Sequence, residues 1–380
     1  MSQDALKYHA DLKGKIEVIS RVKIETREDL ALAYTPGVAE PCKEIALHPE
    51  KVYEYTRKGN MVAVITDGSA VLGLGNIGPE AGLPVMEGKC ILFKEFAGVD
   101  AFPIALKTQD VDEFVRTVEL ISPMFGGINL EDISAPRCFE IERKLRERLD
   151  IPVFHDDQHG TAIVVLAGLL NAIPLAGKNL TDVQIVINGA GAAGTAIAEL
   201  LHAAGAKNIR VLDSLGIISL KRSDLNEEKK LLAGFTNSEQ KEGTLGDALI
   251  AADVFIGVSK AGLLTAAMIR TMNEKAIIFA MANPTPEIFP DKAKEAGAFI
   301  VATGRSDFPN QVNNVLAFPG IFRGLLDARI KTMNNKMYIA AARAIASVVT
   351  NPNGENILPS PFEKTVSLAV AEAVKFVGKN

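Results

Sequence analysis

Two pairs of adjacent carboxylates stand where apolar runs of the chain end. Glu131 and Asp132 follow the run GINL, and Asp156 and Asp157 follow PVFH. Adjacent acids at strand ends are costly unless water or a cation neutralises them. Three carboxylates from two segments could form an open oxygen site of the kind that Mg²⁺ or Mn²⁺ prefers. The alternative is that they are ordinary surface acids that cap the segments after them.

Two further side chains carry protons that a reaction could use. Lys89 stands in VMEGKCILF, which we expect to enter an apolar strand. Burial there would lower its pKa towards that of a general base, although most lysines at strand starts only extend to solvent. Tyr34 in LAYTPGVAE precedes a Pro-Gly turn that would hold its ring in place, although filling the core is the usual role of a tyrosine.

The motif GxGxxG occurs twice, and its surroundings indicate which copy binds a dinucleotide. The second copy follows the apolar run VQIVIN and opens an alanine-rich helix, so that backbone N–H groups meet the phosphates. The first copy, at residues 73–78, precedes PEAGLPVMEG, where we expect glycine and proline to exclude a long helix. We therefore assign the dinucleotide to the second copy, which comprises Gly189, Ala190, Gly191, Ala192, Ala193 and Gly194.

Asp213 ends the next apolar run, NIRVLD, roughly 20 residues after the last glycine of the motif. An acid at this distance is placed to bind the ribose 2′-hydroxyl and would repel a 2′-phosphate, which favours NAD. Ser214, Lys221 and Arg222 are near enough in sequence to admit the phosphate of NADP instead. We expect NAD as the cofactor, with NADP as the alternative.

Alternating apolar and helical segments must position these residues, and the alternation indicates parallel βαβ units. In the first half the strand-like runs are MVAVITDG, CILFKEF, FPIAL and GINLED, with helices near 110–125 and 142–149. In the second half they are VQIVIN, NIRVLD, DVFIGV, AIIFAMA and AFIVATG. The expected fold is α/β, with a mixed α/β domain over 1–159. A doubly wound, Rossmann-like domain with a helical C-terminal tail follows over 160–380.

Three asparagines fall where such a sheet binds its ligands. Asn283 follows the strand-like AIIFAMA, at the carboxyl edge where open α/β sheets hold substrates and cofactors. Asn313 and Asn314, in QVNNVLAFPG, either cap the segment after them or face the same cleft.

The composition of the 380-residue chain excludes several classes of protein. Hydrophobic residues make up 48% and charged residues 23%, a globular mixture that rules out a disordered chain. The net charge of −5 gives no general attraction for nucleic acid, so we expect none as a partner. The three cysteines, Cys42, Cys90 and Cys138, are far apart and odd in number, which favours a reduced, cytoplasmic setting. The most apolar stretch, 161–177, is too short for a membrane span and is expected to be a buried helix.

Eight blocks of the chain carry a resemblance: LAYTPGVAEPC, VITDGSAVLGLGNIG, VMEGKCILFKEFAGVDAFPI, GGINLEDISAPRCFEIE, FHDDQHGTAIV, INGAGAAGTAIA, MANPTPE and NNVLAFPG. Together, and in this order, they resemble the malic enzymes, in their short bacterial form. The resemblance implies oxidation of (S)-malate and its decarboxylation to pyruvate and CO₂, with NAD or NADP and a divalent cation. It also implies a homodimer, for which we expect the helical N-terminal segment to be a contact.

The resemblance further implies which residues do the chemistry. Glu131, Asp132 and Asp157 match the family's metal ligands, and the cation would hold malate and stabilise the enolate. Lys89 matches the general base, which takes the C2 hydroxyl proton, and Tyr34 matches the general acid, which protonates C3.

The remaining matches concern the substrate and cofactor. Asn283 and Asn314 match asparagines that contact them, and residues 189–194 match the dinucleotide loop. Larger malic enzymes carry an arginine after the TDG block, whereas this chain reads Asp67-Gly-Ser-Ala. We expect backbone N–H groups of residues 73–78 to hold the malate carboxylate in its place.

Two other functions remain open on the sequence. A malolactic enzyme would return the hydride to pyruvate and release lactate. A catalytically silent dinucleotide-binding regulator would keep the fold alone, although it would have no need of Lys89, Tyr34 and the three carboxylates.

Overall fold

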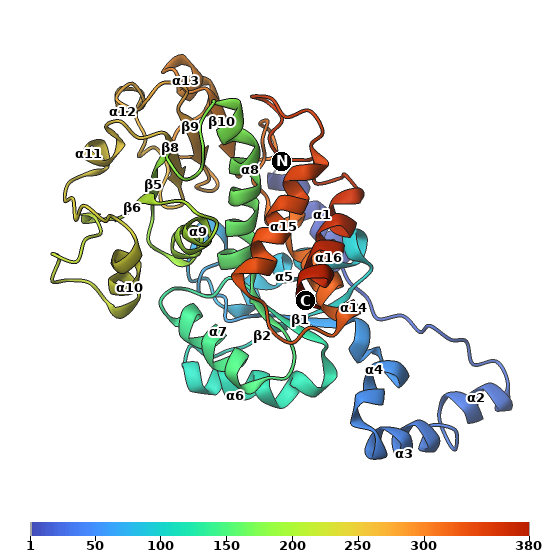
Figure 1. Cartoon of the computed structure of the whole chain (residues 1–380). Coiled ribbons are helices and arrows are strands. Elements are labelled where there is room, and N and C mark those ends of the chain that lie inside the picture. Colours follow the sequence, from blue (N-terminus) through green and yellow to red (C-terminus); the bar gives the residue numbers. More distant parts are fainter. Residues whose placement is uncertain (1, 380) are drawn as a thin grey trace.

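The computed structural model describes residues 2–379, which fold around two sheets of mainly parallel strands (Figure 1). The first sheet has the order β2-β1-β3-β4 and is wholly parallel. Its strands are β1 (Met61–Thr66), β2 (Asp100–Ala105), β3 (Gly127–Leu130) and β4 (Val153–His155). The predictions of strands at MVAVITDG, FPIAL and GINLED are confirmed.

The second sheet has the order β10-β9-β8-β5-β6-β7. Five of its strands are parallel, and the two-residue edge strand β7 is antiparallel to β6. Because the order reverses between β5 and β8, this is a doubly wound sheet of the dinucleotide-binding kind, as predicted. Its strands are β5 (Gln184–Asn188), β6 (Asn208–Asp213), β7 (Gly216–Ile217), β8 (Val254–Gly257), β9 (Ile277–Ala280) and β10 (Ile300–Thr303).

Helices cover both faces of the second sheet. On one face, α8 (Thr161–Leu175), α9 (Ala192–Ala203) and α10 (Glu227–Phe235) pack on alternate residues of β5, such as Ile185 and Ile187. The opposite face, with Val186 of the same strand, is covered by shorter helices. These are α11 (Leu245–Leu249), α12 (Ala266–Ile269) and α13 (Pro290–Glu295).

The first sheet is covered on one face by its own helices and on the other partly by the end of the chain. Helices α6 (Val111–Ile121) and α7 (Arg137–Arg148) pack on Ala63 and Ile65 of β1. The opposite face packs on α5 (Pro79–Ala97) and on α14 (Phe318–Ala328), with α15 (Asn335–Val348) and α16 (Thr365–Gly378) behind them. The two halves of the chain therefore share one core.

Helix α5 corrects two predictions. The segment CILFKEF is not a strand but the second half of this helix, and the glycines and proline between residues 82 and 88 do not prevent it. Met86, Cys90 and Phe93, at helical spacing, bury one side of α5 against the core. This burial outweighs the low helix propensity of Gly and Pro, and Pro79 stands in the first turn, where a missing N–H costs little.

The buried helix predicted at 161–177 is α8, which continues from a π-helical turn, Asp156–Gly160. The combined stretch Asp156–Leu175 is long and apolar enough to cross a membrane, yet 67% of its most apolar window is buried inside the protein. Helix α8 touches both α9 and α15, so it is a core helix of this fold.

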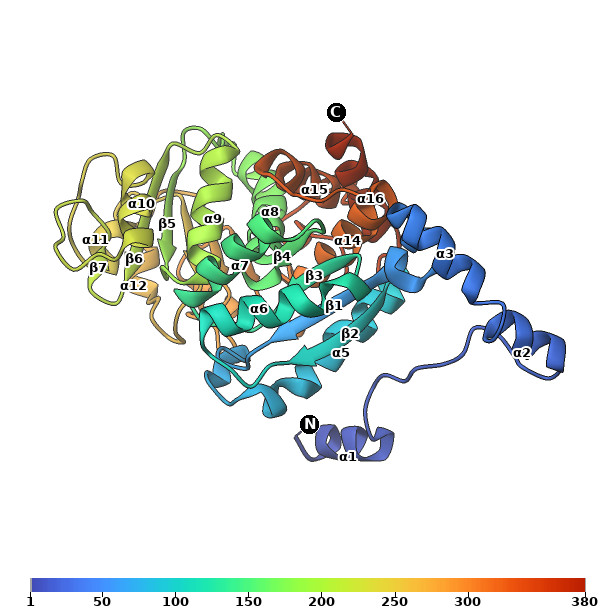
Figure 2. The same cartoon turned by 90° about the horizontal axis from the view of Figure 1, so that it is seen from below.

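The N-terminal segment lies apart from both sheets. It contains α1 (Ser2–Leu12), α2 (Arg27–Ala33), α3 (Ala39–Leu47) and α4 (Val52–Tyr55). We call residues 16–56 the arm. Both views show α2 and α3 projecting away from the body (Figures 1 and 2). No side chain of α2, α3 or α4 is buried.

Candidate active site

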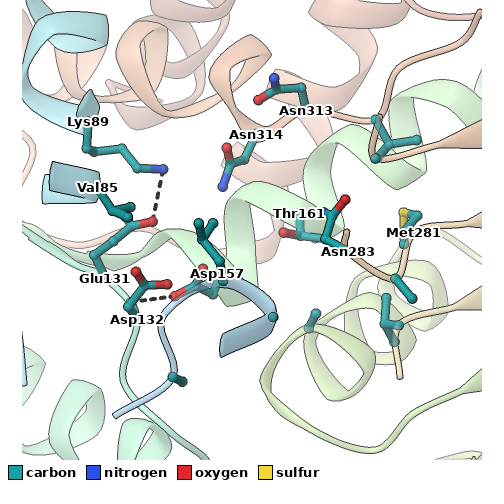
Figure 3. Close-up of a pocket in the computed structure, with 18 of the residues that line it drawn as sticks. Val85, Lys89, Glu131, Asp132, Asp157, Thr161, Met281, Asn283, Asn313 and Asn314 are labelled. Atoms are coloured by element: carbon teal, nitrogen blue, oxygen red, sulfur yellow. Dashed lines mark hydrogen bonds and ion pairs between the residues drawn. The ribbon is translucent and has the colours of Figure 1, made fainter. Parts of the chain in front are cut away.

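A cavity of about 720 Å³ lies between the carboxyl edges of the two sheets (Figure 3). The first sheet contributes residues that follow β1, β3 and β4, together with one side of α5. The second contributes residues that follow β8, β9 and β10 and the start of α9. Parallel sheets bind ligands at this edge, so the cavity is the candidate active site.

Three carboxylates converge on one wall of the cavity. Glu131 and Asp132 come directly after β3, and Asp157 lies in the π-helical turn after β4. Each offers an oxygen, and these oxygens lie within 4.8 Å of one another. The backbone N–H of Asp132 donates to Asp157 Oδ2 at 2.8 Å, and Asn129 Nδ2 donates to Glu131 Oε2 at 2.9 Å. The three acids that the sequence analysis singled out therefore lie together in the structure.

Burial and mutual repulsion raise the pKa values of these acids. Burial and the charge of Asp157 raise the pKa of Glu131 to about 7, although the charge of Lys89 acts to lower it. Burial and the charges of Asp157 and Glu131 raise the pKa of Asp132 to about 9. Burial raises the pKa of Asp157 to about 6. A cluster of this kind is stabilised by a bound cation, which replaces the protons.

The donor set fits a hard divalent cation. All three ligands are carboxylates, the donors that Mg²⁺ and Mn²⁺ prefer, and none is a thiol or imidazole. Asp132 Oδ2 is buried without a hydrogen-bond partner, which is the arrangement expected of an oxygen that receives a metal ion. One side of the acids faces the cavity, where a substrate oxygen could complete the coordination (Figure 3).

Lys89 projects from α5 onto the same acids. Its Nζ lies 2.6 Å from Asp156 Oδ2 and 3.0 Å from Glu131 Oε1, and 4.4 Å from the ring centre of Phe318. Burial acts to lower the pKa of Lys89, but the charges of Asp156 and Glu131 outweigh it and raise the pKa above its usual value. The expected lowering by burial alone is therefore wrong, because the sequence did not reveal the acids that surround the amine.

Tyr34 is not in the cavity of its own chain. It ends α2 on the arm, and its side chain is 66% exposed. Tyr34 therefore does not fill a core within residues 2–379, and its role as an acid stays a prediction. The cavity and the tyrosine are both present, but one chain does not bring them together.

The glycine loop has the geometry that binds pyrophosphate. Gly189 follows β5 with φ of 130°, a conformation that side chains rarely adopt, and a Cβ on Gly194 would lie 1.8 Å from the Gly189 carbonyl oxygen. Both positions therefore require glycine. Helix α9 begins at Ala192, and Ala193 lines the cavity, so free N–H groups face the space where a dinucleotide would lie.

Asp213, at the end of β6, is held by two cations rather than one. Arg222 donates to both of its oxygens at 2.8 and 3.0 Å, and Lys229 Nζ lies 2.6 Å from Oδ2. Although burial opposes them, these bonds lower the pKa of Asp213 to about 2. Arg222 was anticipated as a neighbour of the ribose, whereas Lys229 was missed because it comes from α10.

Asn283 and Asn314 both line the cavity, on the side of the second sheet (Figure 3).

Asp156 was seen in the sequence as one of a pair, but its role as the partner of Lys89 was missed. Asp67 of the TDG block pairs with Arg137 at 2.9 Å, but Arg137 does not line the cavity.

Comparison with known proteins adds independent evidence. The family model described as malic enzyme, N-terminal domain, matches residues 13–146, and the malic enzyme, NAD binding domain, matches residues 158–377. A bifunctional malic/malolactic enzyme of Bacillus subtilis is 59% identical over 98% of this chain and 92% of its own length. An NADP-dependent malic enzyme of Escherichia coli is 49% identical over 98% of this chain and 52% of its own. The crystal structure of malic enzyme from Pyrococcus horikoshii superposes with a TM-score of 0.95 at 53% identity, covering 100% of this chain and 90% of that one.

Proposed function

The chain belongs to the malic enzyme family, and we propose that it catalyses the metal-dependent oxidative decarboxylation of (S)-malate to pyruvate and CO₂ with reduction of NAD or NADP. The observation that carries the proposal is the placement of three carboxylates and a buried lysine opposite a dinucleotide loop, across one cavity. A silent regulator would have no use for this arrangement.

Glu131, Asp132 and Asp157 would hold the divalent cation. When bound, the cation supplies Lewis-acid polarisation of the malate oxygens and offsets the negative charge around Lys89. The protein's own part is to aim the three oxygens at one point and to exclude water around them, since two of the acids are almost fully buried.

Lys89 is the proposed base for the C2 hydroxyl. It lies beside the acids, and Asp156 and Glu131 fix its amine over the cavity. Removing the hydroxyl proton allows hydride to leave C2 for the nicotinamide, which the loop at 189–194 would present from the other side. Tyr34 is the proposed donor of the proton that C3 gains after CO₂ leaves.

The second carboxylate of malate needs its own contact, and the loop after β1 offers little. Within that loop the N–H groups of Ile77 and Gly78 already bond Gly68 O, and that of Leu74 bonds Val71 O. Gly73 lines the cavity, so its N–H is the proposed contact. Asn283 and Asn314 are the proposed amide contacts to substrate and nicotinamide.

We also propose that residues 1–159 bind the metal and the substrate and that residues 160–380 bind the dinucleotide. A cytoplasmic setting is also proposed, and the three free cysteines support it.

The test is an assay with malate, Mn²⁺ or Mg²⁺ and each nicotinamide cofactor. We expect stoichiometric reduced cofactor, pyruvate and CO₂, and loss of turnover with a chelator. The B. subtilis relative is named as both malic and malolactic, so lactate is the second candidate product. Lactate formed without accumulation of reduced cofactor would favour that second reaction.

A further inference from the structure

The turn after β4 has a rare geometry that other groups must stabilise. Residues Asp156–Gly160 form one π-helical turn, in which the backbone N–H of Thr161 bonds Asp156 O. Turns of this kind are short, uncommon and frequently found at functional sites. This one carries Asp157, which faces the other two acids of the proposed metal site, and Asp156, the partner of Lys89 (Figure 3). A shift of the turn would therefore disturb both pairs of contacts.

Most side chains of the turn do little to hold it. Burial and the charge of Asp156 disfavour the charged form of Asp157. Asp156 Oδ1 and Gln158 Nε2 are buried without a hydrogen-bond partner. A Cβ on Gly160 would lie 1.9 Å from Asp156 Oδ1, so this position must lack a side chain. The remaining side chain of the turn is that of His159.

His159 does not line the cavity and is held by groups outside it. Its Nε2 lies 2.9 and 3.0 Å from the two carboxylate oxygens of Glu142, so this nitrogen carries a proton and donates it. Its ring is stacked on that of Tyr338, with the ring centres 4.8 Å apart and the planes inclined by 17°. The imidazole is therefore fixed along its edge by a carboxylate and across its face by an aromatic ring.

Arg146 joins the two groups that hold the imidazole. Its Nη2 lies 2.8 Å from Glu142 Oε1 and donates to Tyr338 Oη at 2.6 Å, while its Nε donates to Val153 O at the start of β4. Glu142 and Tyr338 are 5% and 4% exposed. We call Glu142, Arg146, His159 and Tyr338 the clamp. It combines residues of α7, in the first half of the chain, with a residue of α15, in the C-terminal tail.

We propose that His159 is a positioning residue: the clamp fixes its ring, and the ring fixes the π-helical turn that places Asp157 at the metal site. The inference rests on the proposed function and adds to it residues that act through Asp157 without touching metal or substrate. Because Tyr338 belongs to the C-terminal tail, that tail contributes to metal binding in the first half of the chain. Groups that orient a metal ligand commonly change metal affinity by about 10–100-fold when they are removed.

The affinity of the whole chain for Mn²⁺, measured by electron paramagnetic resonance at fixed pH without substrate, tests the clamp. We expect His159→Ala to weaken Mn²⁺ binding by about tenfold and to leave the affinity for NAD unchanged. Loss of a positive charge near the acids would by itself strengthen cation binding, so weakening indicates positioning. His202→Ala, which removes a histidine packed on Phe235, is the matched control and should bind Mn²⁺ as the wild type does.

A second variant separates positioning from a general loss of stability. Because Tyr338 acts through His159, Tyr338→Leu should weaken Mn²⁺ binding, and adding it to His159→Ala should weaken the binding no further. Ile345→Ala removes a fully buried side chain of the same helix and should keep the wild-type affinity. Each variant is measured well below its own unfolding temperature. If His159→Ala does not fold, Tyr338→Leu against Ile345→Ala decides the matter.

Wild-type Mn²⁺ affinity in His159→Ala, or additive losses in the double variant, would overturn the clamp and leave the metal site itself untouched. Equal weakening in Ile345→Ala would also overturn it, because affinity would then follow stability alone. A wild-type chain that binds no Mn²⁺ would instead overturn the proposed function, and this inference with it.

Discussion

The wall of the cavity formed by Lys89, Glu131, Asp132 and Asp157, which we call the floor, and the N-terminal arm each supply one of the two proposed proton carriers. The two regions differ most in burial. Lys89 is 7% exposed, paired with two acids and packed on an aromatic ring. Tyr34 is 66% exposed and lies on helices without a buried residue. Burial within the chain orients the first residue, whereas the described residues leave the second in solvent.

The largest effect should come from removing one carboxylate of the proposed metal site. We expect Asp157→Ala to lower malate turnover by ~10³-fold or more, since Lewis-acid stabilisation is worth several kcal/mol and about 1.4 kcal/mol is tenfold. NAD binding, measured by calorimetry, should survive because the loop at 189–194 is on the other sheet. Asp291→Ala, an exposed acid of α13, is the control. Undiminished turnover by Asp157→Ala in the presence of chelator would show that the metal assignment is wrong.

Next in size, the two proton carriers should fail at different steps. Lys89→Ala should lose malate oxidation by roughly 10²–10⁴-fold, the usual range for a general base. Tyr34→Phe should instead slow the protonation step, seen as loss of the enzyme-catalysed exchange of the C3 hydrogens of added pyruvate with D₂O. Equal losses in malate oxidation, oxaloacetate decarboxylation and pyruvate reduction would contradict this division. Lys94→Ala, exposed on the same helix, serves as the control for Lys89.

The two regions should also differ in stability. Phe93→Ala removes a fully buried ring that contacts Phe318 and Phe322, at a cost of roughly 3–5 kcal/mol in the free energy of unfolding. Leu32→Ala on the arm should change that free energy by less than about 0.5 kcal/mol when the chain is dilute. The same arm substitution should weaken dimerisation, measured by sedimentation. A large loss of stability with dimerisation unchanged would mean that the arm packs on its own chain.

Only the floor should respond to pH through the metal. With pKa values of about 7, 9 and 6 for Glu131, Asp132 and Asp157, protons compete with the cation, so the affinity for Mn²⁺ should rise from pH 6 to pH 9. Each displaced proton contributes up to about tenfold per pH unit. Because these pKa values are raised by folding, stability without added cation should fall as pH rises through the same window. Calorimetry in two buffers of different ionisation enthalpy measures the released protons. An affinity independent of pH would contradict the assignment.

The smallest effect should be on cofactor choice, at the far side of the cavity. We expect NAD to be preferred, and Asp213→Ala to move the ratio of kcat/KM for NADP over NAD by about tenfold towards NADP, since about 1.4 kcal/mol is tenfold. The change removes a carboxylate that repels a 2′-phosphate and also frees Arg222 and Lys229 to bind it. Arg222→Ala should move the ratio the other way. An unchanged ratio in both variants would place the 2′-position elsewhere.

Patterns local in sequence predicted much of the fold correctly. The position of the glycine loop, most strands of both sheets and the proximity of the three acids follow from short motifs, because periodicity and turn chemistry are local properties. Helix α5 was missed because Gly82 and Pro84 have low helix propensity, while the contacts that overcome it come from β1 and α14. The spacing of Met86, Cys90 and Phe93 was the signal available. The charge state of Lys89 and the position of Tyr34 depend on residues far away in sequence, which no local pattern reports.

The shared core has a consequence for synthesis of the chain. Phe318 and Phe322 of α14 pack on Phe93 and cover the apolar face of the first sheet that β1 contributes to. Phe318 also lies beneath the amine of Lys89. When only the first half of the chain has left the ribosome, that apolar face is exposed to water. The N-terminal half therefore completes its core, and Lys89 reaches its final surroundings, only after α14 has emerged.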